Sequence, residues 1–150
     1  MEIPAEAARR LVEHARVARL ATIARDGHAR LAPIVYASIG DALWSPIDGK
    51  PKRGGELARV RDVRRDPRVC VLVDGWDERW SQLWWVRIEG HARVVPAAAA
   101  PGPLAALAHK YPQYETVPTT DASDQVLEIR VARRTTWAAS AAAWDHLAPA

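Results

Sequence analysis

Residues 17–45, VARLATIARDGHARLAPIVYASIGDALWS, decide the fold of this chain. Short runs rich in hydrophobic residues predict three strands, at residues 17–23, 29–37 and 42–45. Asp26-Gly27, between the first two runs, is typical of a tight hairpin turn, and Gly40-Asp41 supplies the second turn. The stretch therefore predicts three antiparallel strands that follow one another in a meander.

The rest of the chain adds three strands and three helices to this meander. The strands are expected at residues 68–73, 83–95 and 125–137, and the helices at residues 5–12, 56–66 and 104–110. Six mostly antiparallel strands with short connecting helices give an α+β fold with a barrel-like sheet. Closure of the sheet is expected because a closed sheet leaves no aggregation-prone edge.

Residues 1–150 are expected to form a single domain. The Ala-rich tail, residues 138–150, has no clear packing role in the sequence and is expected to fray. No apolar run approaches the roughly 20 residues that span a bilayer, and the first residues lack the apolar core of a signal peptide. We therefore expect a cytoplasmic protein without membrane contact.

Several kinds of catalytic or metal site have no support in the sequence. Cys70 is the only cysteine, which excludes a disulfide within the chain, and its apolar surroundings predict a core filler. The five histidines are scattered without metal-ligand spacing. Neither a nucleophile motif nor a glycine-rich nucleotide-binding motif is present. No catalytic side chain and no metal site are therefore predicted.

The positive charge of the chain is concentrated in one segment. The formal net charge is +3, but residues 50–68 hold eight Lys or Arg and three Asp or Glu, a local net charge of +5. Such a concentration favours a local anionic ligand over a broad nucleic-acid surface, for which the sequence also offers no docking helix with base-reading side chains.

A phosphate site is the natural interpretation of this segment. A strand ends at Ser45, a loop rich in glycine and proline follows, and a helix begins after Gly55. The free amides of a helix N-terminus and nearby cations attract an anion. The candidate ligands to a phosphate are Ser45, Lys50, Lys52 and Arg53. The alternative is a solvated, charged loop.

Tryptophan is the other unusual feature, because the chain has seven tryptophans and no phenylalanine. Trp84 and Trp85 are neighbours on a predicted strand and must face opposite sides of the sheet. One can pack in the core, and the other needs a second layer. Flat indole rings suit a planar ligand, a core or a contact between subunits.

An ordered set of short motifs gives the chain a resemblance over residues 17–137. The motifs are Leu20-Ala21-Thr22, Asp26-Gly27, Ala32-Pro33-Ile34-Val35, Asp48-Gly49-Lys50-Pro51-Lys52-Arg53, Asp66-Pro67-Arg68-Val69, Trp84-Trp85-Val86-Arg87-Ile88-Glu89-Gly90 and Lys110-Tyr111-Pro112-Gln113-Tyr114. This set resembles the pyridoxamine 5′-phosphate oxidase-like superfamily of split β-barrel, FMN-binding proteins. Within that superfamily it is most similar to the actinobacterial branch of F420-dependent enzymes.

The resemblance implies a split β-barrel homodimer with two cofactor sites at the interface. Ser45, Lys50, Lys52 and Arg53 would then face the cofactor phosphate. The flavin-like ring would lie along Thr22, Pro33, Ile34 and Val35. The wall of the site, or the partner's contribution to it, would include Trp84, Trp85 and Arg87.

The function that this resemblance implies is an F420-dependent oxidoreductase. A reduced deazaflavin would donate a hydride to a small conjugated substrate, and the protein would position the cofactor and exclude water. The choice of coenzyme F420 over FMN rests on the resemblance. An FMN-dependent oxidoreductase of the same fold and a non-catalytic carrier or sensor remain alternatives.

Overall fold

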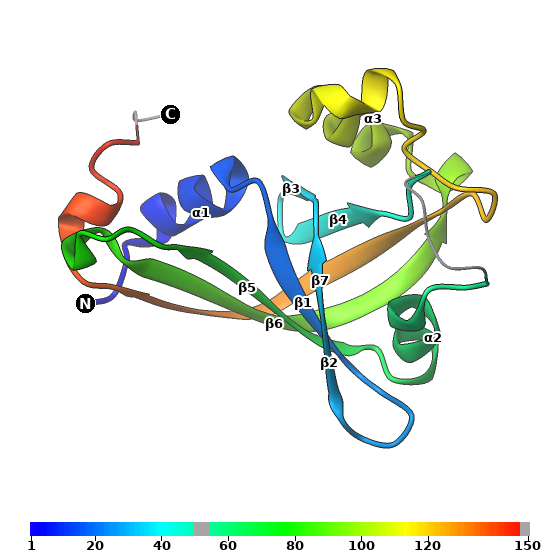
Figure 1. Cartoon of the computed structure of the whole chain (residues 1–150), viewed down its shortest axis with the longest axis horizontal. Coiled ribbons are helices and arrows are strands. Elements are labelled where there is room, and N and C mark those ends of the chain that lie inside the picture. Colours follow the sequence, from blue (N-terminus) through cyan, green and yellow to red (C-terminus); the bar gives the residue numbers. More distant parts are fainter. Residues whose placement is uncertain (50–54, 148–150) are drawn as a thin grey trace.

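The computed structural model describes residues 1–49 and 55–147 (Figure 1). Within these residues the strands are β1 (Ala18–Ile23), β2 (Ala29–Ile34), β3 (Ala37–Ile39), β4 (Ala42–Pro46), β5 (Arg68–Gly75), β6 (Trp84–Pro96) and β7 (Gln125–Ala138). The α-helices are α1 (Ala5–His14), α2 (Ala58–Arg65) and α3 (Pro101–Lys110). Short 3₁₀ turns are η1 (Trp80–Gln82), η2 (Ala97–Ala99), η3 (Pro112–Glu115) and η4 (Ala141–Ala143). None of the described helices is long and apolar enough to cross a membrane.

The strands form one antiparallel sheet that curls into a split β-barrel. Its strand order is β2-β1-β5-β6-β7-β4-β3, so β2 and β3 are the two outermost strands. Only Val35 and Tyr36 separate the end of β2 from the start of β3. Three Cα–Cα steps of about 3.8 Å span at most about 11 Å, so the two edges of the sheet must come close together. The expected α+β fold with a barrel-like sheet is confirmed.

The predicted meander of the first three strands is wrong. The strand expected at residues 29–37 is divided at Val35-Tyr36, which raises the number of strands from six to seven. The β1–β2 and β3–β4 hairpins consequently lie at opposite edges of the sheet. The division has a physical cause: the hydroxyl of Tyr111 accepts a hydrogen bond from the Tyr36 amide at 3.1 Å and lies 3.0 Å from the Tyr36 carbonyl oxygen, to which it donates. These backbone groups are thereby taken out of the sheet ladder.

Two hydrophobic cores hold the helices against the sheet. Alternate side chains of the central strands point into the barrel and pack with α1; the largest include Leu20, Val71, Val73, Val86, Ile88, Leu127 and Ile129, with Leu11 and Val12 of the helix. The second core lies beneath α3, where Leu107 and Tyr111 pack on Ala37, Val95 and Val126. Alternate residues of the strands therefore point to opposite faces of the sheet, and each face has its own hydrophobic core.

The tail after Ala138 packs against the barrel, so the expectation that it has no packing role is wrong for residues 138–147. Ala143 and Trp144 are buried in the first core. The Ala139 amide donates to the Leu83 carbonyl at 2.9 Å, and the Ser140 hydroxyl donates to the Ser81 carbonyl at 2.7 Å. The tail packs here because β7 ends beside the start of β6, where η1 offers carbonyl acceptors.

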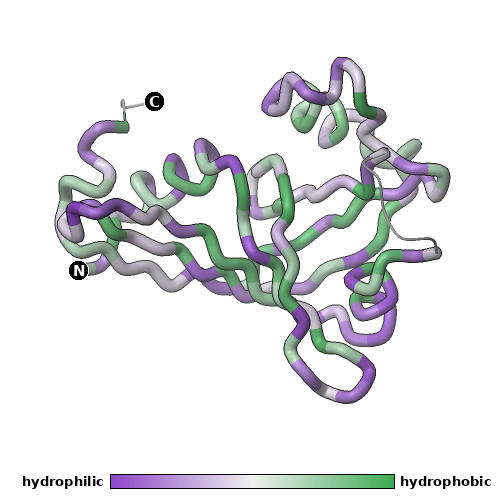
Figure 2. Tube along the Cα trace, in the orientation of Figure 1, coloured by the Kyte–Doolittle hydropathy of each residue, from purple (hydrophilic) through white to green (hydrophobic). Residues whose placement is uncertain are grey.

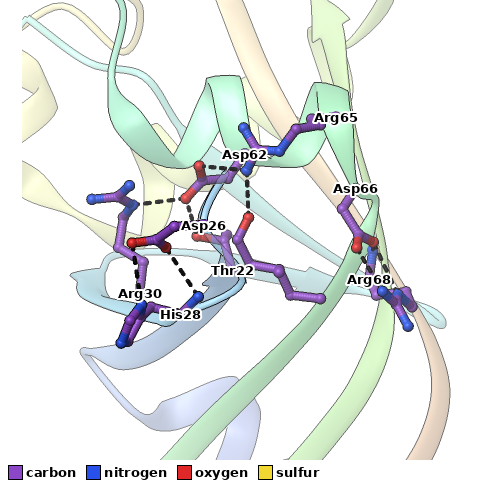
Figure 3. A network of polar contacts seen from close by, with 9 residues as sticks. Thr22, Asp26, His28, Arg30, Asp62, Arg65, Asp66 and Arg68 are labelled. Atoms are coloured by element: carbon purple, nitrogen blue, oxygen red, sulfur yellow. Dashed lines mark hydrogen bonds and ion pairs between the residues drawn. The ribbon is translucent and has the colours of Figure 1, made fainter.

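A buried carboxylate fastens α2 to the β1–β2 hairpin (Figure 3). Asp62 accepts hydrogen bonds from the Thr22 hydroxyl at 2.8 Å, from Arg30 Nε at 2.8 Å and from Arg65 Nη2 at 3.0 Å. Burial by itself raises the pKa of Asp62, but the hydrogen bonds from Arg30, Thr22 and Arg65 outweigh it and hold that pKa below its usual value. Figure 2 shows that much of α2 is hydrophilic, and its buried apolar side chains are Val60 and Val63. The polar contacts of Asp62 therefore add to a small apolar contact.

The Asp62 cluster predicts a specific loss of stability. Asp62→Asn should lower the free energy of unfolding by about 1–3 kcal/mol at neutral pH, because charge-assisted bonds to buried and half-buried donors are lost. The folded-state pKa is depressed, so the stabilisation is complete above the unfolded pKa of about 4 and is lost as the pH falls below it. Urea unfolding of both proteins across this range measures the difference. The exposed Asp26→Asn, in the same hairpin, is the control and should change little; a pH-independent difference for Asp62→Asn would contradict the prediction.

Candidate functional site

A small pocket lies where β1 begins and where β2 and β4 end. We call it the β4 pocket; it has a volume of about 220 Å³ and is lined by Val17, Pro33, Ile34, Val35, Ser45, Pro46, Asp48 and Arg59. Four of the residues predicted to bind a cofactor, Pro33, Ile34, Val35 and Ser45, therefore lie together. One side of the pocket is apolar, and the other carries a guanidinium and a carboxylate.

The break between β2 and β3 builds the apolar side of the β4 pocket. Ile34 is buried and anchors the end of β2, whereas Pro33 is exposed. The Ser45 hydroxyl donates to the Val35 carbonyl at 3.0 Å and holds this backbone in place across the sheet. Ser45 therefore positions residues 33–35, along which the resemblance implies a cofactor ring. The Ser45 oxygen can still accept a hydrogen bond at the edge of the pocket.

Arg59 supplies the cation of the β4 pocket. Its Nε is buried and has no hydrogen-bond partner among the described residues. Burial lowers the pKa of Arg59, and the nearby Asp48 carboxylate opposes this effect. A buried guanidinium donor without an acceptor is costly unless a ligand satisfies it. An anionic group with free oxygens, such as a phosphate, fits this donor.

The other arginines of α2 are engaged elsewhere. Arg61 and Arg64 both contact Glu56, at its carbonyl oxygen and its carboxylate respectively. Arg65 donates to the Ile23 carbonyl at 2.6 Å and to Asp62. The arginines of α2 therefore have different surroundings, although they lie in one basic segment of the sequence. Arg59 lines the β4 pocket, whereas Arg61, Arg64 and Arg65 do not.

Lys50, Lys52 and Arg53 lie outside the described residues, so their contact with a phosphate stays a prediction. The described chain approaches this segment from the β4 pocket itself, because Asp48 lines the pocket. The Gly49 amide then donates to the Pro118 carbonyl at 3.0 Å. A β-carbon at Gly49 would lie 2.9 Å from Pro118, which explains why glycine stands at this position.

Thr22 is absent from the lining of the β4 pocket. Its side chain is buried, and its hydroxyl donates to Asp62 rather than lining the β4 pocket. The contact of Thr22 with a cofactor ring is untested, but the structure gives its hydroxyl a role in the Asp62 cluster.

Trp84, Trp85 and Arg87 line a second pocket, separate from the β4 pocket. This tryptophan pocket, of about 360 Å³, is lined by Leu72, Asp74, Gly75, Trp76, Leu83, Trp84, Trp85, Arg87 and Trp137. Trp84 packs against the first core, whereas Trp85 pairs with Trp137 across β6 and β7 and lies 5.6 Å from the Arg87 guanidinium. Within one chain the predicted site residues therefore form two clusters.

A third pocket adjoins the β4 pocket, and little in the sequence points to it. This tyrosine pocket, of about 400 Å³, is lined by Arg16, Val35, Tyr111, Gln113, Tyr114 and Val117. Val35 lines both pockets, and the Tyr114 hydroxyl donates to Asp48 of the β4 pocket at 2.6 Å. Motifs of the resemblance touch it, among them residues 110–114 and the motif that begins at Asp48, but nothing marks Arg16.

Lys110 lies beside the tyrosine pocket as a buried cation. Its Nζ is 4.1 Å from the centre of the Tyr36 ring and has no hydrogen-bond partner among the described residues. Burial, reinforced by Arg16 and opposed by Glu13, lowers the pKa of Lys110 from 10.5 to about 8. Two cationic side chains therefore lie close together here, Arg16 in the lining of the pocket and Lys110 beside it.

Comparison with known proteins agrees with this fold. A family model described as Pyridoxamine 5′-phosphate oxidase matches residues 4–138. Among solved structures, a conserved hypothetical protein, Rv2991, from Mycobacterium tuberculosis is 22% identical with a TM-score of 0.71, covering 99% of this chain and 94% of that one. An F420 reductase is 22% identical with a TM-score of 0.66, covering 88% and 98%. An FAD-binding protein from Mesorhizobium loti is 18% identical with a TM-score of 0.65, covering 91% and 93%. At these identities the solved structures establish the fold alone.

The lowered pKa of Lys110 predicts how the free energy of unfolding changes with pH. Between about pH 8 and 10.5 the unfolded chain binds more protons at Lys110 than the folded chain, so this residue makes stability rise with pH. Lys110→Met should therefore be more stable than the wild type near pH 7, and its advantage should shrink by about pH 9. Urea unfolding at both pH values measures this change. The exposed neighbour His109→Met should show no such trend, and a constant advantage of Lys110→Met would show that burial of the charge is not the cause.

Proposed function

The chain belongs to the pyridoxamine 5′-phosphate oxidase family, and on this premise we propose that it is an oxidoreductase whose β4 pocket holds a phosphorylated flavin or deazaflavin. The observation that carries the proposal is the unpartnered, buried Nε of Arg59 beside the apolar wall of Pro33, Ile34 and Val35. A phosphate satisfies the first feature and a flat ring the second. When bound, such a cofactor supplies hydride transfer.

The chain's own residues have the roles of binding and positioning in this proposal. In this proposal Arg59 binds the phosphate, together with Lys50, Lys52 and Arg53. Ser45 fixes the Val35 carbonyl, and this fixes the wall against which the ring lies. Hydride transfer between a cofactor and a substrate needs no nucleophile from the protein. The substrate is then a small conjugated molecule that reaches the ring.

Coenzyme F420 is the cofactor that we propose, and FMN is the alternative. F420 carries a longer and more highly charged tail than FMN, which favours a site with several cations. Arg61, Arg64 and Arg65 add little to this attraction because Glu56, Asp62 and backbone carbonyls engage them. The preference therefore rests on Arg59, on the Lys50–Arg53 segment and on the resemblance to F420-dependent enzymes.

We also propose that the site is completed in a homodimer. The β4 pocket, at about 220 Å³, is below the range of roughly 300–1,000 Å³ that is typical of pockets for cofactor-sized ligands. The outer face of β1, β2, β5, β6 and β7 exposes apolar side chains: Leu31 is 71% exposed, Leu72 37% and Trp137 38%. In this proposal a second copy packed on this face buries these residues and brings its Trp85 and Arg87 to the β4 pocket, whereas Trp84 stays in the core of its own protomer.

The proposed cofactor site is tested by Arg59→Met. A lost charge-assisted bond of about 1.5–3 kcal/mol corresponds to a roughly ten- to hundredfold weaker affinity for the cofactor. Equilibrium titration with F420 and with FMN, followed by absorbance or fluorescence, measures it. The matched control is Arg61→Met, on the same helix but bonded to Glu56, which should bind like the wild type.

The titration also distinguishes an F420-dependent enzyme from an FMN-dependent enzyme and from a carrier. F420 should bind more tightly than FMN at low salt, and the reduced deazaflavin should be reoxidised by a quinone or an enone. Binding of FMN alone would move the proposal to an FMN-dependent enzyme. Binding without reoxidation by any acceptor would favour a carrier or sensor, and unchanged affinity in Arg59→Met would remove the β4 pocket from the cofactor site.

The dimer is tested by Leu72→Glu. Leu72 pairs with Arg19 and Arg87 across the sheet, so a carboxylate there finds cationic neighbours and an isolated protomer should stay folded. In sedimentation, the wild type should have about twice the 16.5 kDa mass of the chain, whereas Leu72→Glu should be monomeric and bind the cofactor weakly. The control Ile39→Glu changes an exposed residue of β3 and should remain dimeric. A monomeric wild type would sink the proposal.

A further inference from the structure

We propose that the tyrosine pocket binds the substrate of this enzyme, and that the substrate is a planar conjugated carboxylate held by Arg16. This inference rests on the proposed function insofar as the β4 pocket is taken to hold the cofactor ring. The ligand class itself follows from the charge and shape of the tyrosine pocket.

The position of the tyrosine pocket suits a substrate beside a cofactor. Val35 lines both pockets and forms the wall between them. Arg16 and Val17, which follow one another in the chain, line the tyrosine pocket and the β4 pocket respectively. At about 400 Å³ the tyrosine pocket is large enough for a small ligand. Arg59 lies in the β4 pocket and not in this one, so a phosphate at Arg59 leaves the tyrosine pocket available.

Arg16 is an exposed cation whose guanidinium makes two contacts within the chain. One of its terminal nitrogens, Nη1, donates to the Lys110 carbonyl at 2.9 Å, and the guanidinium lies 4.6 Å from the centre of the Tyr111 ring. The Tyr111 hydroxyl also lies 3.1 Å from the Arg16 carbonyl oxygen, which shares the single proton of that hydroxyl with the Tyr36 carbonyl oxygen. No carboxylate pairs with Arg16 among the described residues. Because a guanidinium has five donors, Arg16 keeps N–H groups for a ligand, and a carboxylate matches their geometry.

The remaining walls select a flat and apolar body. The rings of Tyr111 and Tyr114 meet edge to face, with centroids 6.1 Å apart and planes at 78°. Val35 and Val117 complete the apolar lining, and Gln113 adds an amide. A planar ring can stack on one tyrosine and meet the edge of the other.

The charges around the pocket orient such a ligand. Lys110, with its unpartnered ammonium on the Tyr36 ring, adds positive charge near Arg16. Tyr114, another residue of the lining, instead donates to the Asp48 carboxylate, which belongs to the β4 pocket. A carboxylate therefore belongs at Arg16, and the conjugated end of the ligand then points towards Val35 and the cofactor.

The test uses 2-naphthoate as the probe and isothermal titration of the purified protein as the measurement. 2-Naphthoate should bind, whereas the neutral 2-naphthamide and the non-planar decahydro-2-naphthoate should bind at least tenfold more weakly. Arg16→Gln should weaken 2-naphthoate binding about ten- to hundredfold and leave 2-naphthamide binding unchanged, and Arg16→Lys should recover part of the loss. Arg9→Gln, an exposed arginine of α1 paired with Glu6, is the matched control and should behave like the wild type.

The ratio of naphthoate affinity to naphthamide affinity separates a lost charge from disturbed packing. Disturbed packing in Arg16→Gln would weaken both probes, whereas the loss of the charge weakens only the carboxylate. An unchanged ratio in Arg16→Gln, or no naphthoate binding to the wild type, would overturn the proposal. Naphthoate should also bind in the presence of saturating F420 or FMN, and mutual exclusion would assign the pocket to the cofactor instead. If naphthoate binds through Arg16 but neither cofactor binds, the ligand site stands and the proposed function fails.

Discussion

The two residues between β2 and β3 are the constraint on which the rest of the structure depends. They join the outermost strands of a seven-stranded sheet, so the sheet has to curl until its edges meet. Tyr36 is held at this point from three sides: its amide and carbonyl bond to the Tyr111 hydroxyl, and its own hydroxyl donates to the Val12 carbonyl. One buried tyrosine thereby ties the junction to α1 and to the end of α3.

The same junction creates the candidate site. Because Val35 leaves the sheet ladder, its carbonyl is available to Ser45, and its side chain lines both the β4 pocket and the tyrosine pocket. The helix that carries Arg59 is fastened independently, through Asp62, to the β1–β2 hairpin. Two sets of polar contacts, far apart in the chain, thus place an apolar wall opposite a buried cation. In a chain that binds a phosphorylated ring these are the two features that the protein has to supply.

Two of the tryptophans, Trp85 and Trp137, lie on the outer face of the sheet. Trp84 packs against the first core, but Trp85 and Trp137 pair across β6 and β7 on the outer face, where Trp137 is exposed. A sheet face with apolar side chains in contact with solvent is typical of an interaction surface. The proposed dimer would account both for this exposed apolar surface and for the small volume of the β4 pocket. In it, the outer face of one protomer supplies the missing wall of the partner's β4 pocket.

The sequence by itself determined where most helices and strands lie along the chain, because the alternation of strands, the proline and glycine positions and the helical spacing are local properties. It also placed Pro33, Ile34, Val35 and Ser45 in one site, through motifs that resemble a known family, and the β4 pocket gathers them. The tertiary structure alone decided where the chain breaks at Tyr36, since the cause is a hydroxyl 75 residues away at Tyr111. It alone separated Arg59 from Arg61, Arg64 and Arg65, brought Asp48 to Tyr114 and gave the tail a core to pack in. Burial, and the partners that burial requires, depend on distant segments that no local pattern in the sequence records.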